Sequence, residues 1–172
     1  MPLSSKDWHN IGDFSEGLAS VQVQVPDNSV YQGYRVEKYG YIDRSGKFVI
    51  QPRFDRVEKF SEGKALFFQT GKNSGYGFID SKGHVVVKPK YLAAKSFSEG
   101  LAAVAIKSTD DKEIWGYINE EGRGVIEPRF QYAASFNGGL AAVNCDQYGE
   151  NCKAYIDRKG KTRWLAAFSS PK

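Results

Sequence analysis

Three short sequence blocks recur in a fixed order along this chain, and this repetition restricts the fold more than any other feature. The first block reads Phe14-Ser15-Glu16-Gly17-Leu18-Ala19 and returns, with small changes, from Phe60, Phe97 and Phe136. Its copies begin 46, 37 and 39 residues apart. Periods of this length indicate an array in which each unit buries its apolar face against its neighbours.

The second and third blocks keep the same register. The second reads aromatic-Ile-Asp-x-x-Gly and begins at Tyr41, Phe78, Tyr117 and Tyr155, with Asn119 replacing Asp in the third copy. The third block is an apolar residue, any residue, Pro, a basic residue and an aromatic, and it begins at Ile50, Val87 and Ile126. The wider first spacing indicates an insertion of about eight residues within Pro26 to Glu37.

Each block has the pattern of β-structure. Val21, Val23 and Val25 alternate with glutamines, the period of two expected of a half-buried strand. The second block predicts a hairpin that turns near Gly46, and Pro52 is expected to end the strand that follows. Such units contain about three strands each.

We therefore predict an all-β fold, a tandem array of about four antiparallel β units of roughly 38 residues. The single array spans residues 1–172, with a lead-in at 1–13 and units at 14–59, 60–96, 97–135 and 136–172. An open solenoid and a curled ring both remain compatible with this pattern.

The aromatic-Gly pair before the second block resembles the signature of the WG (KWG) repeat family found in bacteria. Trp115-Gly116 matches it, Tyr39-Gly40 and Tyr76-Gly77 are conservative variants, and Lys153-Ala154 departs from it. The fourth unit also has Trp164 and its neighbours where a Pro block would stand, so we expect it to cap the array. The resemblance implies a β scaffold with no shared catalytic residue, and some members look like immunity proteins that neutralise bacterial toxins.

Charge and hydropathy give weaker indications. The chain has 24 Lys and Arg against 20 Asp and Glu, and a net charge of +4 is too small to indicate nucleic-acid binding by itself. No stretch reaches the roughly 18 apolar residues of a membrane-spanning helix. Residues 1–9 lack the apolar core of a secretory signal, so we expect a cytoplasmic protein.

No group of residues points to catalysis, a cofactor or a metal. The two histidines, His9 and His84, have no metal-ligand spacing, and His84 falls at an expected hairpin turn. Acids at Asp43, Asp80 and Asp157 occupy one repeated position, where Asp or Asn bonds the backbone of the following turn. We therefore expect a binding protein without enzymatic activity.

Cys145 and Cys152 are the two cysteines of the chain. By position they match Val23 and Lys38 in the first unit and Ile106 and Ile114 in the third, so they are expected to face each other across a strand pair. Reduced buried thiols suit a cytoplasmic protein, and a disulfide remains the alternative.

The units differ most in the loops between the first and second blocks, at 26–37, 70–74, 107–113 and 146–151. In a stacked array equivalent loops fall along one edge. This edge carries acids and tyrosines, a composition that favours protein binding, although ordinary solvated loops would have a similar one. The candidate protein-binding residues are Tyr31, Tyr34, Asp110, Asp111, Glu113, Asp146, Tyr148 and Glu150.

The opposite edge is expected to gather the hairpin turns and Pro blocks and to be basic. With Phe54, Tyr91 and Phe130 it offers an alternative function, the binding of nucleic acid or another polyanion, although these aromatics also fit a buried core. The basic residues are Arg44, Lys47, Arg53, Lys82, Lys90, Arg123, Arg129, Arg158, Lys159, Lys161 and Arg163.

Overall fold

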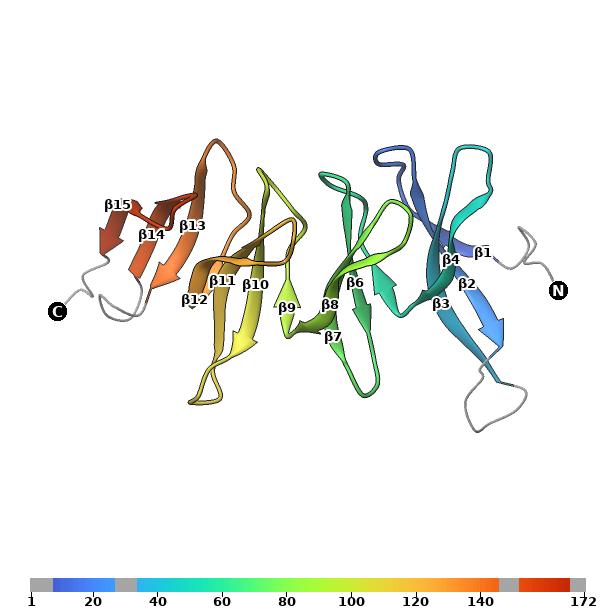
Figure 1. The fold of residues 1–172 in the computed structure, drawn as a ribbon, viewed down its shortest axis with the longest axis horizontal. Helices are drawn as coiled ribbons and strands as arrows, with labels where there is room; N and C mark the ends of the chain where they lie inside the picture. The colour runs from blue at the N-terminus through green and yellow to red at the C-terminus, as the bar shows by residue number, and fades with distance from the viewer. Residues whose placement is uncertain (1–7, 27–33, 146–151, 168–172) are drawn as a thin grey trace. The chain divides into compact units, whose positions relative to one another are not determined.

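The computed structural model describes residues 8–26, 34–145 and 152–167, and all regular structure in these ranges is β (Figure 1). The chain forms two compact units, Met1–Lys90 and Tyr91–Lys172. The strands of the first unit are β1 (Trp8–Ile11), β2 (Ala19–Pro26), β3 (Arg35–Ile42), β4 (Phe48–Phe54), β5 (Arg56–Val57), β6 (Lys64–Gln69), β7 (Gly75–Asp80) and β8 (Val85–Tyr91). The strands of the second are β9 (Ala93–Ala94), β10 (Leu101–Lys107), β11 (Glu113–Asn119), β12 (Gly124–Ala133), β13 (Leu140–Cys145), β14 (Cys152–Asp157) and β15 (Thr162–Ala167).

The strands build meandering sheets, as the sequence predicts. The first unit contains two four-stranded sheets, ordered β1-β2-β3-β4 and β5-β6-β7-β8, and the second unit contains one seven-stranded sheet running from β9 to β15. Each pair with a described register is antiparallel, for example β10 with β11 from Leu101 opposite Asn119 to Lys107 opposite Glu113. The prediction of an all-β repeat of antiparallel units is therefore confirmed.

A short fourth strand, which we call the tail strand, ties each repeat to the next. It follows the Pro block and pairs with the first strand of the following repeat: β5 pairs with β6, β9 with β10, and the end of β12 with β13. At the start of the chain β1 takes the same place beside β2. The described part of the lead-in thus belongs to the fold, and β1 takes the place of a tail strand beside the first repeat.

The first block forms a tight two-residue turn in every repeat. In the first copy the backbone of Ser15 and Leu18 is paired by hydrogen bonds of 2.9 and 3.0 Å, with Glu16 and Gly17 both at positive φ. Two consecutive positive φ values define the hairpin turn whose twist matches that of its flanking strands. A non-glycine residue at positive φ is strained, so Glu16, Glu62 and Glu99 need a compensating contact.

Apolar residues of consecutive repeats pack into shared cores, which is why one repeat alone would be incomplete. In the first unit Tyr41, Ile50 and Phe54 pack against Phe60 and Phe67 of the second repeat. In the second unit the equivalent residues of the third and fourth repeats do the same. This burial between neighbours is the main source of stability expected in a repeat array.

The Pro block departs from the expectation that Pro52 ends its strand. β4 continues to Phe54, and the register jumps from Tyr41 opposite Ile50 to Tyr39 opposite Phe54. The extra residues form a bulge, which is the position in a sheet where the missing proline donor does no harm.

Candidate binding surfaces

In each unit the described variable loop lies at the same end as the strand ends that flank the other variable segment, and we call this the loop end. In Figure 1 the β6–β7 loop lies at the same end of its unit as the ends of β2 and β3, and the β10–β11 loop lies at the same end as those of β13 and β14. The opposite, or turn end, holds the hairpin turns and the turns of the first block. The predicted separation of loops from turns therefore holds inside each unit.

The three acids of the β10–β11 loop differ in the contacts that their carboxylates make within the fold. Lys107 Nζ lies 2.5 Å from a carboxylate oxygen of Asp111, which has a φ of 63°. Glu113 accepts a 2.9 Å hydrogen bond from the indole nitrogen of Trp115, so it fixes a core side chain. Asp110 accepts a 3.0 Å hydrogen bond from the hydroxyl of its neighbour Thr109. Because this contact is exposed and local, Asp110 is the acid best placed to bind a partner.

The other predicted residues divide between the described and undescribed ranges. Tyr34 is highly exposed just before β3, as an interface residue would be. Tyr31, Asp146, Tyr148 and Glu150 lie outside the described residues. Cys145 pairs with Cys152 in the Cα register, as Ile106 does with Ile114, so the predicted backbone pairing is confirmed, while their redox state stays a prediction.

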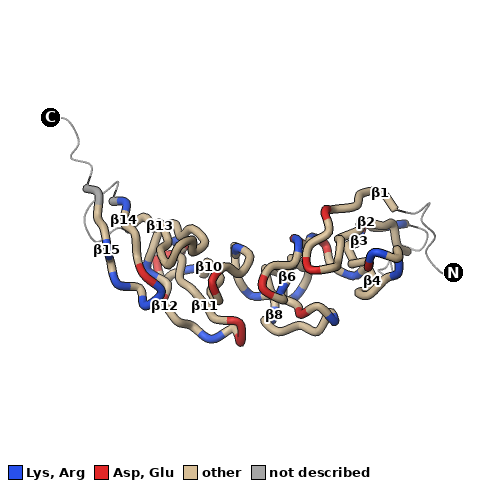
Figure 2. The backbone as a smooth tube through the Cα atoms, turned by 90° about the horizontal axis from the view of Figure 1, so that it is seen from above, with Lys and Arg blue, Asp and Glu red and all other residues tan. Residues whose placement is uncertain are grey.

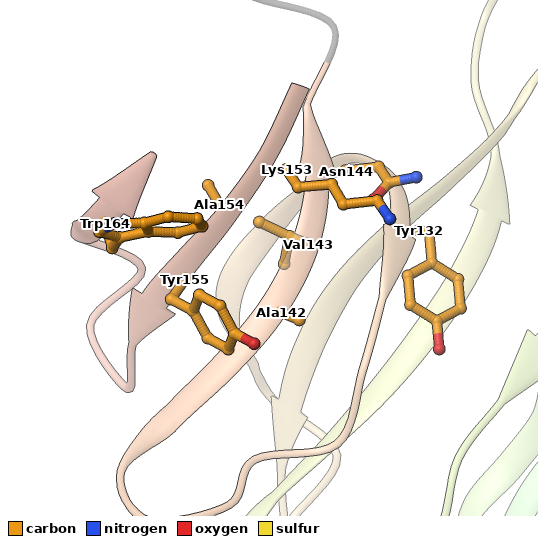
Figure 3. Close-up of a pocket in the computed structure, with 8 residues that line it drawn as sticks. All are labelled: Tyr132, Ala142, Val143, Asn144, Lys153, Ala154, Tyr155 and Trp164. Atoms are coloured by element: carbon orange, nitrogen blue, oxygen red, sulfur yellow. The ribbon is translucent and has the colours of Figure 1, made fainter. Parts of the chain in front are cut away.

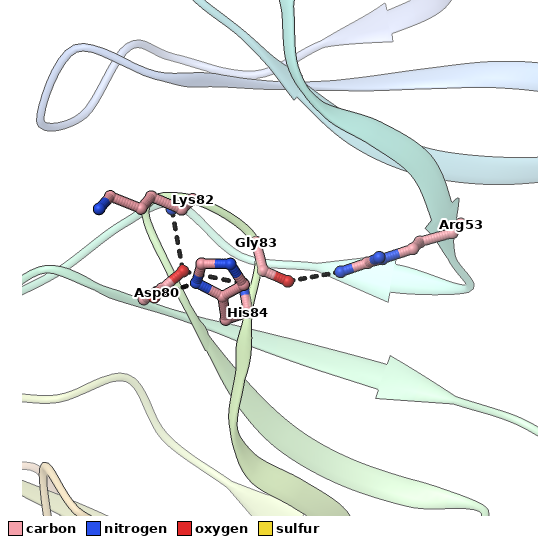
Figure 4. A network of polar contacts seen from close by, with 5 residues as sticks. All are labelled: Arg53, Asp80, Lys82, Gly83 and His84. Atoms are coloured by element: carbon pink, nitrogen blue, oxygen red, sulfur yellow. Dashed lines mark hydrogen bonds and ion pairs between the residues drawn. The ribbon is translucent and has the colours of Figure 1, made fainter.

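At the turn end, the repeated acids organise the turns as predicted. Asp43 accepts hydrogen bonds from the Ser45 hydroxyl and from two backbone nitrogens, and these bonds, the hydroxyl first, lower the pKa of its carboxyl. Desolvation raises the pKa of Asp80, but hydrogen bonds from His84 and Lys82 outweigh it and the pKa is lowered (Figure 4). His84 itself is mostly exposed and its ring nitrogen lies 3.0 Å from Asp80.

The basic residues of the Pro blocks also hold repeats together. The Arg53 guanidinium donates to the Gly83 carbonyl in the next repeat's turn (Figure 4), and Arg129 donates to the Gly160 carbonyl at 2.9 Å. The block aromatics Phe54, Tyr91 and Phe130 are buried, in agreement with their interpretation as core.

Positions of both charge signs are spread along both units (Figure 2). At the turn end the carboxylates of Asp43, Asp80 and Asp157 bond the backbone of the hairpin turns, among the basic residues, so the expected charge separation is only partial. These observations weigh against a polyanion surface at the turn end, because two of its arginines and all three aromatics are engaged within the fold. Among the residues that the structure describes, no cluster of metal-ligating side chains is found, and no helix is long and apolar enough to cross a membrane.

A third surface, which we call the open face, was missed by the sequence reasoning. It is a shallow groove of about 570 Å³ on the outer side of the fourth repeat (Figure 3). Tyr155 and Trp164 stand on one side of it and Tyr132 on the other, above a floor that includes Ala142. Asn144 and Lys153 add polar groups at one margin.

The open face corresponds to the surface by which the first and third repeats contact the repeats that follow them. Strand registers place Tyr155 at the position of Tyr117, and Ala142 at that of Ala103. The third-repeat residues are buried against the fourth, whereas Tyr155 and Trp164 are exposed. The expected cap is thus incomplete, because a capping repeat would have a polar outer face. The sequence signal for this surface was an aromatic residue, Tyr155, at a position of the fourth repeat that is buried between repeats elsewhere.

Together, the sheets and the interlocking turns define an all-β repeat scaffold that presents loops at one end of each unit. The sequence profile of the family described as WG containing repeat matches residues 39–72, 76–108 and 115–148, more than half of the chain, so the chain belongs to this family. Each match begins at an aromatic-Gly pair, and the fourth pair position, Lys153-Ala154, is not matched.

Comparison with solved structures supports the architecture. One described as the crystal structure of the eukaryotic initiation factor is similar over 94% of this chain and 55% of that one, with a TM-score of 0.52 and 9% sequence identity. The chain thus spans about half the length of that structure, and the likeness is one of fold. A search of curated protein sequences gives no match.

Proposed function

We propose that this chain is a non-enzymatic scaffold that binds a protein partner through the loop end of its second unit. The observation that carries the proposal is the contrast between the turns, which keep one pattern in all repeats, and the β10–β11 loop, where Asp110 and Asp111 stand between two paired strands. Binding residues on loops held by a rigid scaffold are the common arrangement in recognition proteins. An acidic loop of this kind suits a partner that is basic where it docks.

In its more specific form, the partner is a bacterial toxin or effector domain that the scaffold occludes, as an immunity protein does. This form is supported by the resemblance to WG repeat proteins of that kind and by the acidic loop. It implies a complex in the bacterial cytoplasm and protection of cells that produce the toxin.

The test is co-purification of the full chain from its native cells, followed by titration of the captured partner. We expect Asp110→Lys to raise the Kd by about three- to tenfold, since a charge at an interface rim contributes modestly. Glu121→Lys is the matched control because it makes the same charge change in the hairpin turn at the other end of β11. If Asp110→Lys and Glu121→Lys bind the partner with equal affinity, the β10–β11 loop is not part of the interface. Capture of nucleic acid alone, with steep salt dependence, would favour the polyanion alternative.

A further inference from the structure

The two repeats of each unit are joined by a tyrosine and a phenylalanine. Tyr41 packs on Phe60 with ring centroids 4.8 Å apart, and Tyr117 packs on Phe136 at 4.9 Å, both edge to face. Each tyrosine hydroxyl also donates to a carbonyl just after the tail strand that leads into the next repeat, that of Glu58 at 2.5 Å or Ala134 at 2.8 Å. The pair therefore combines an aromatic contact with a hydrogen bond.

In the first repeat the phenylalanine of this pair is exposed, and in the fourth repeat the tyrosine is exposed. Phe14 occupies the position of Phe60 but is 41% exposed where Phe60 is 2% exposed. Tyr155 occupies the position of Tyr117 but is 44% exposed where Tyr117 is 1% exposed. Figure 3 shows the Tyr155 ring on the open face beside Trp164.

The start of the chain also supplies the second element of such a joint, the tail strand. Gly12 N donates to Ser20 O at 2.9 Å, as Glu58 N donates to Leu66 O at 2.9 Å. The Gly12 carbonyl thus corresponds to the Glu58 carbonyl that Tyr41 bonds. With β1 in place beside β2, the N-terminal end presents counterparts of both groups that Tyr41 contacts at its joint, the phenylalanine and the carbonyl after the tail strand.

We propose that the open face of one molecule binds the N-terminal end of a second copy of this chain, with Phe14 on Tyr155. The argument rests on continuity with the joints inside each unit, which show what covers this face wherever it is buried. The contact is heterologous, because it joins two different surfaces of the same chain. Each bound copy leaves one of these surfaces open, so further copies can bind in the same way.

The same comparison predicts a weak, reversible association. In the third repeat, the Glu99 carboxylate accepts a 2.9 Å hydrogen bond from Gly139 N of the fourth, and Ser98 Oγ donates to Phe136 O at 2.7 Å. The fourth repeat has Asn137 and Gly138 at these positions. The open face thus keeps the tyrosine of the joint but lacks the glutamate carboxylate that bonds the next repeat, so the contact should be weaker than a joint inside the chain.

Sedimentation velocity of the full chain over a concentration series tests this proposal. We expect larger species as concentration rises, and Phe14→Ala or Tyr155→Ala should each raise the Kd about tenfold or more. Neither side chain belongs to the buried core, so the fold should tolerate either change. Val125→Ala, which shortens an exposed apolar side chain of β12 that does not line the open face, is the control and should associate like the parent.

Two further variants test the head-to-tail geometry. A mixture of Phe14→Ala and Tyr155→Ala proteins retains one intact pair of ends, so it should form dimers at concentrations where each variant alone is monomeric. Gly138→Glu should tighten the association by restoring the carboxylate, at a position with a φ of 61°, close to that of Glu99. A protein that stays monomeric at every concentration, or associates equally well in both alanine variants, would overturn the proposal.

Discussion

The backbone of Pro128 occupies the space that a side chain on Gly116 would need. A Cβ on Gly116 would stand 2.7 Å from the Pro128 nitrogen and 2.5 Å from the Ile126 carbonyl oxygen. The first repeat has the same relationship, since a Cβ on Gly40 would stand 2.8 Å from the nitrogen of Pro52. The glycine of the aromatic-Gly pair is therefore required by the close approach of the Pro block backbone.

Gly116→Ala should consequently destabilise the second unit by about 1–3 kcal/mol, because the clash is with backbone atoms that cannot rotate away. Urea unfolding followed by tryptophan fluorescence measures this loss. Ala154→Gly is the matched control: Ala154 lies opposite Leu165 in regular pairing, so the change should cost less than about 1 kcal/mol. Equal losses at the two sites would show that the bulge does not constrain Gly116.

This fit explains why two departures of the fourth repeat occur together. The sequence showed Ala154 in place of glycine and the missing Pro block as separate irregularities. In the fourth repeat Ala154 lies directly opposite Leu165, without the register shift that accompanies Gly116, and alanine is accommodated. The repeat period, the turns and the facing cysteine positions could all be predicted, because they depend on local pattern and register. The steric link could not, because it joins adjacent strands at a bulge.

Acid should weaken the fold through the turn carboxylates. The pKa values of Asp43, Asp80 and Asp157 are lowered in the folded state, chiefly by hydrogen bonds at Asp43 and Asp157 and by hydrogen bonds that outweigh desolvation at Asp80. A folded pKa below the unfolded value, about 3.9, means that the contribution to stability is complete above that value and is lost as the pH falls through the folded pKa. Urea midpoints measured from pH 7 to about pH 2 should therefore fall mainly below about pH 4.

Asp80→Asn gives a specific control for this prediction. Asn119 stands at the same position in the third repeat and accepts a 2.9 Å hydrogen bond from Arg123 N, so an asparagine preserves the turn bond without a titrating group. The variant should fold and lose less stability than the parent between pH 4 and pH 2. An unchanged acid profile would assign the acid sensitivity to other carboxylates.

The sequence was less informative about which repeated surface is left open. Tyr117 and Tyr155 occupy equivalent positions, yet one is buried and the other exposed. Periodicity identifies a residue that can form a joint, but its burial depends on the neighbour that covers it. The acids of the β10–β11 loop show the same limit, since the bond from Trp115 to Glu113 is a tertiary contact that loop composition does not reveal.

Glu99 should be a residue where glycine is a better replacement than alanine. Its φ of 56° is strained for any side chain, while its carboxylate bonds Gly139 N in the next repeat. Glu99→Ala loses the bond and keeps the strain, so we expect a loss of about 1–2 kcal/mol. Glu99→Gly also loses the bond but removes the strain, and should recover about 1 kcal/mol of that loss. Urea unfolding of the three proteins gives the order, and a more stable alanine variant would contradict it.

The Tyr117 hydroxyl should stabilise the joint between the third and fourth repeats. Burial raises the pKa of this phenol, which therefore stays protonated and donates to the Ala134 carbonyl. Tyr117→Phe leaves that part-buried acceptor without this donor and should cost about 1–2 kcal/mol in urea unfolding. Tyr155→Phe makes the same chemical change on the exposed open face and should stay within about 0.5 kcal/mol of the parent. If both variants unfold at the parent midpoint, aromatic packing alone accounts for the joint.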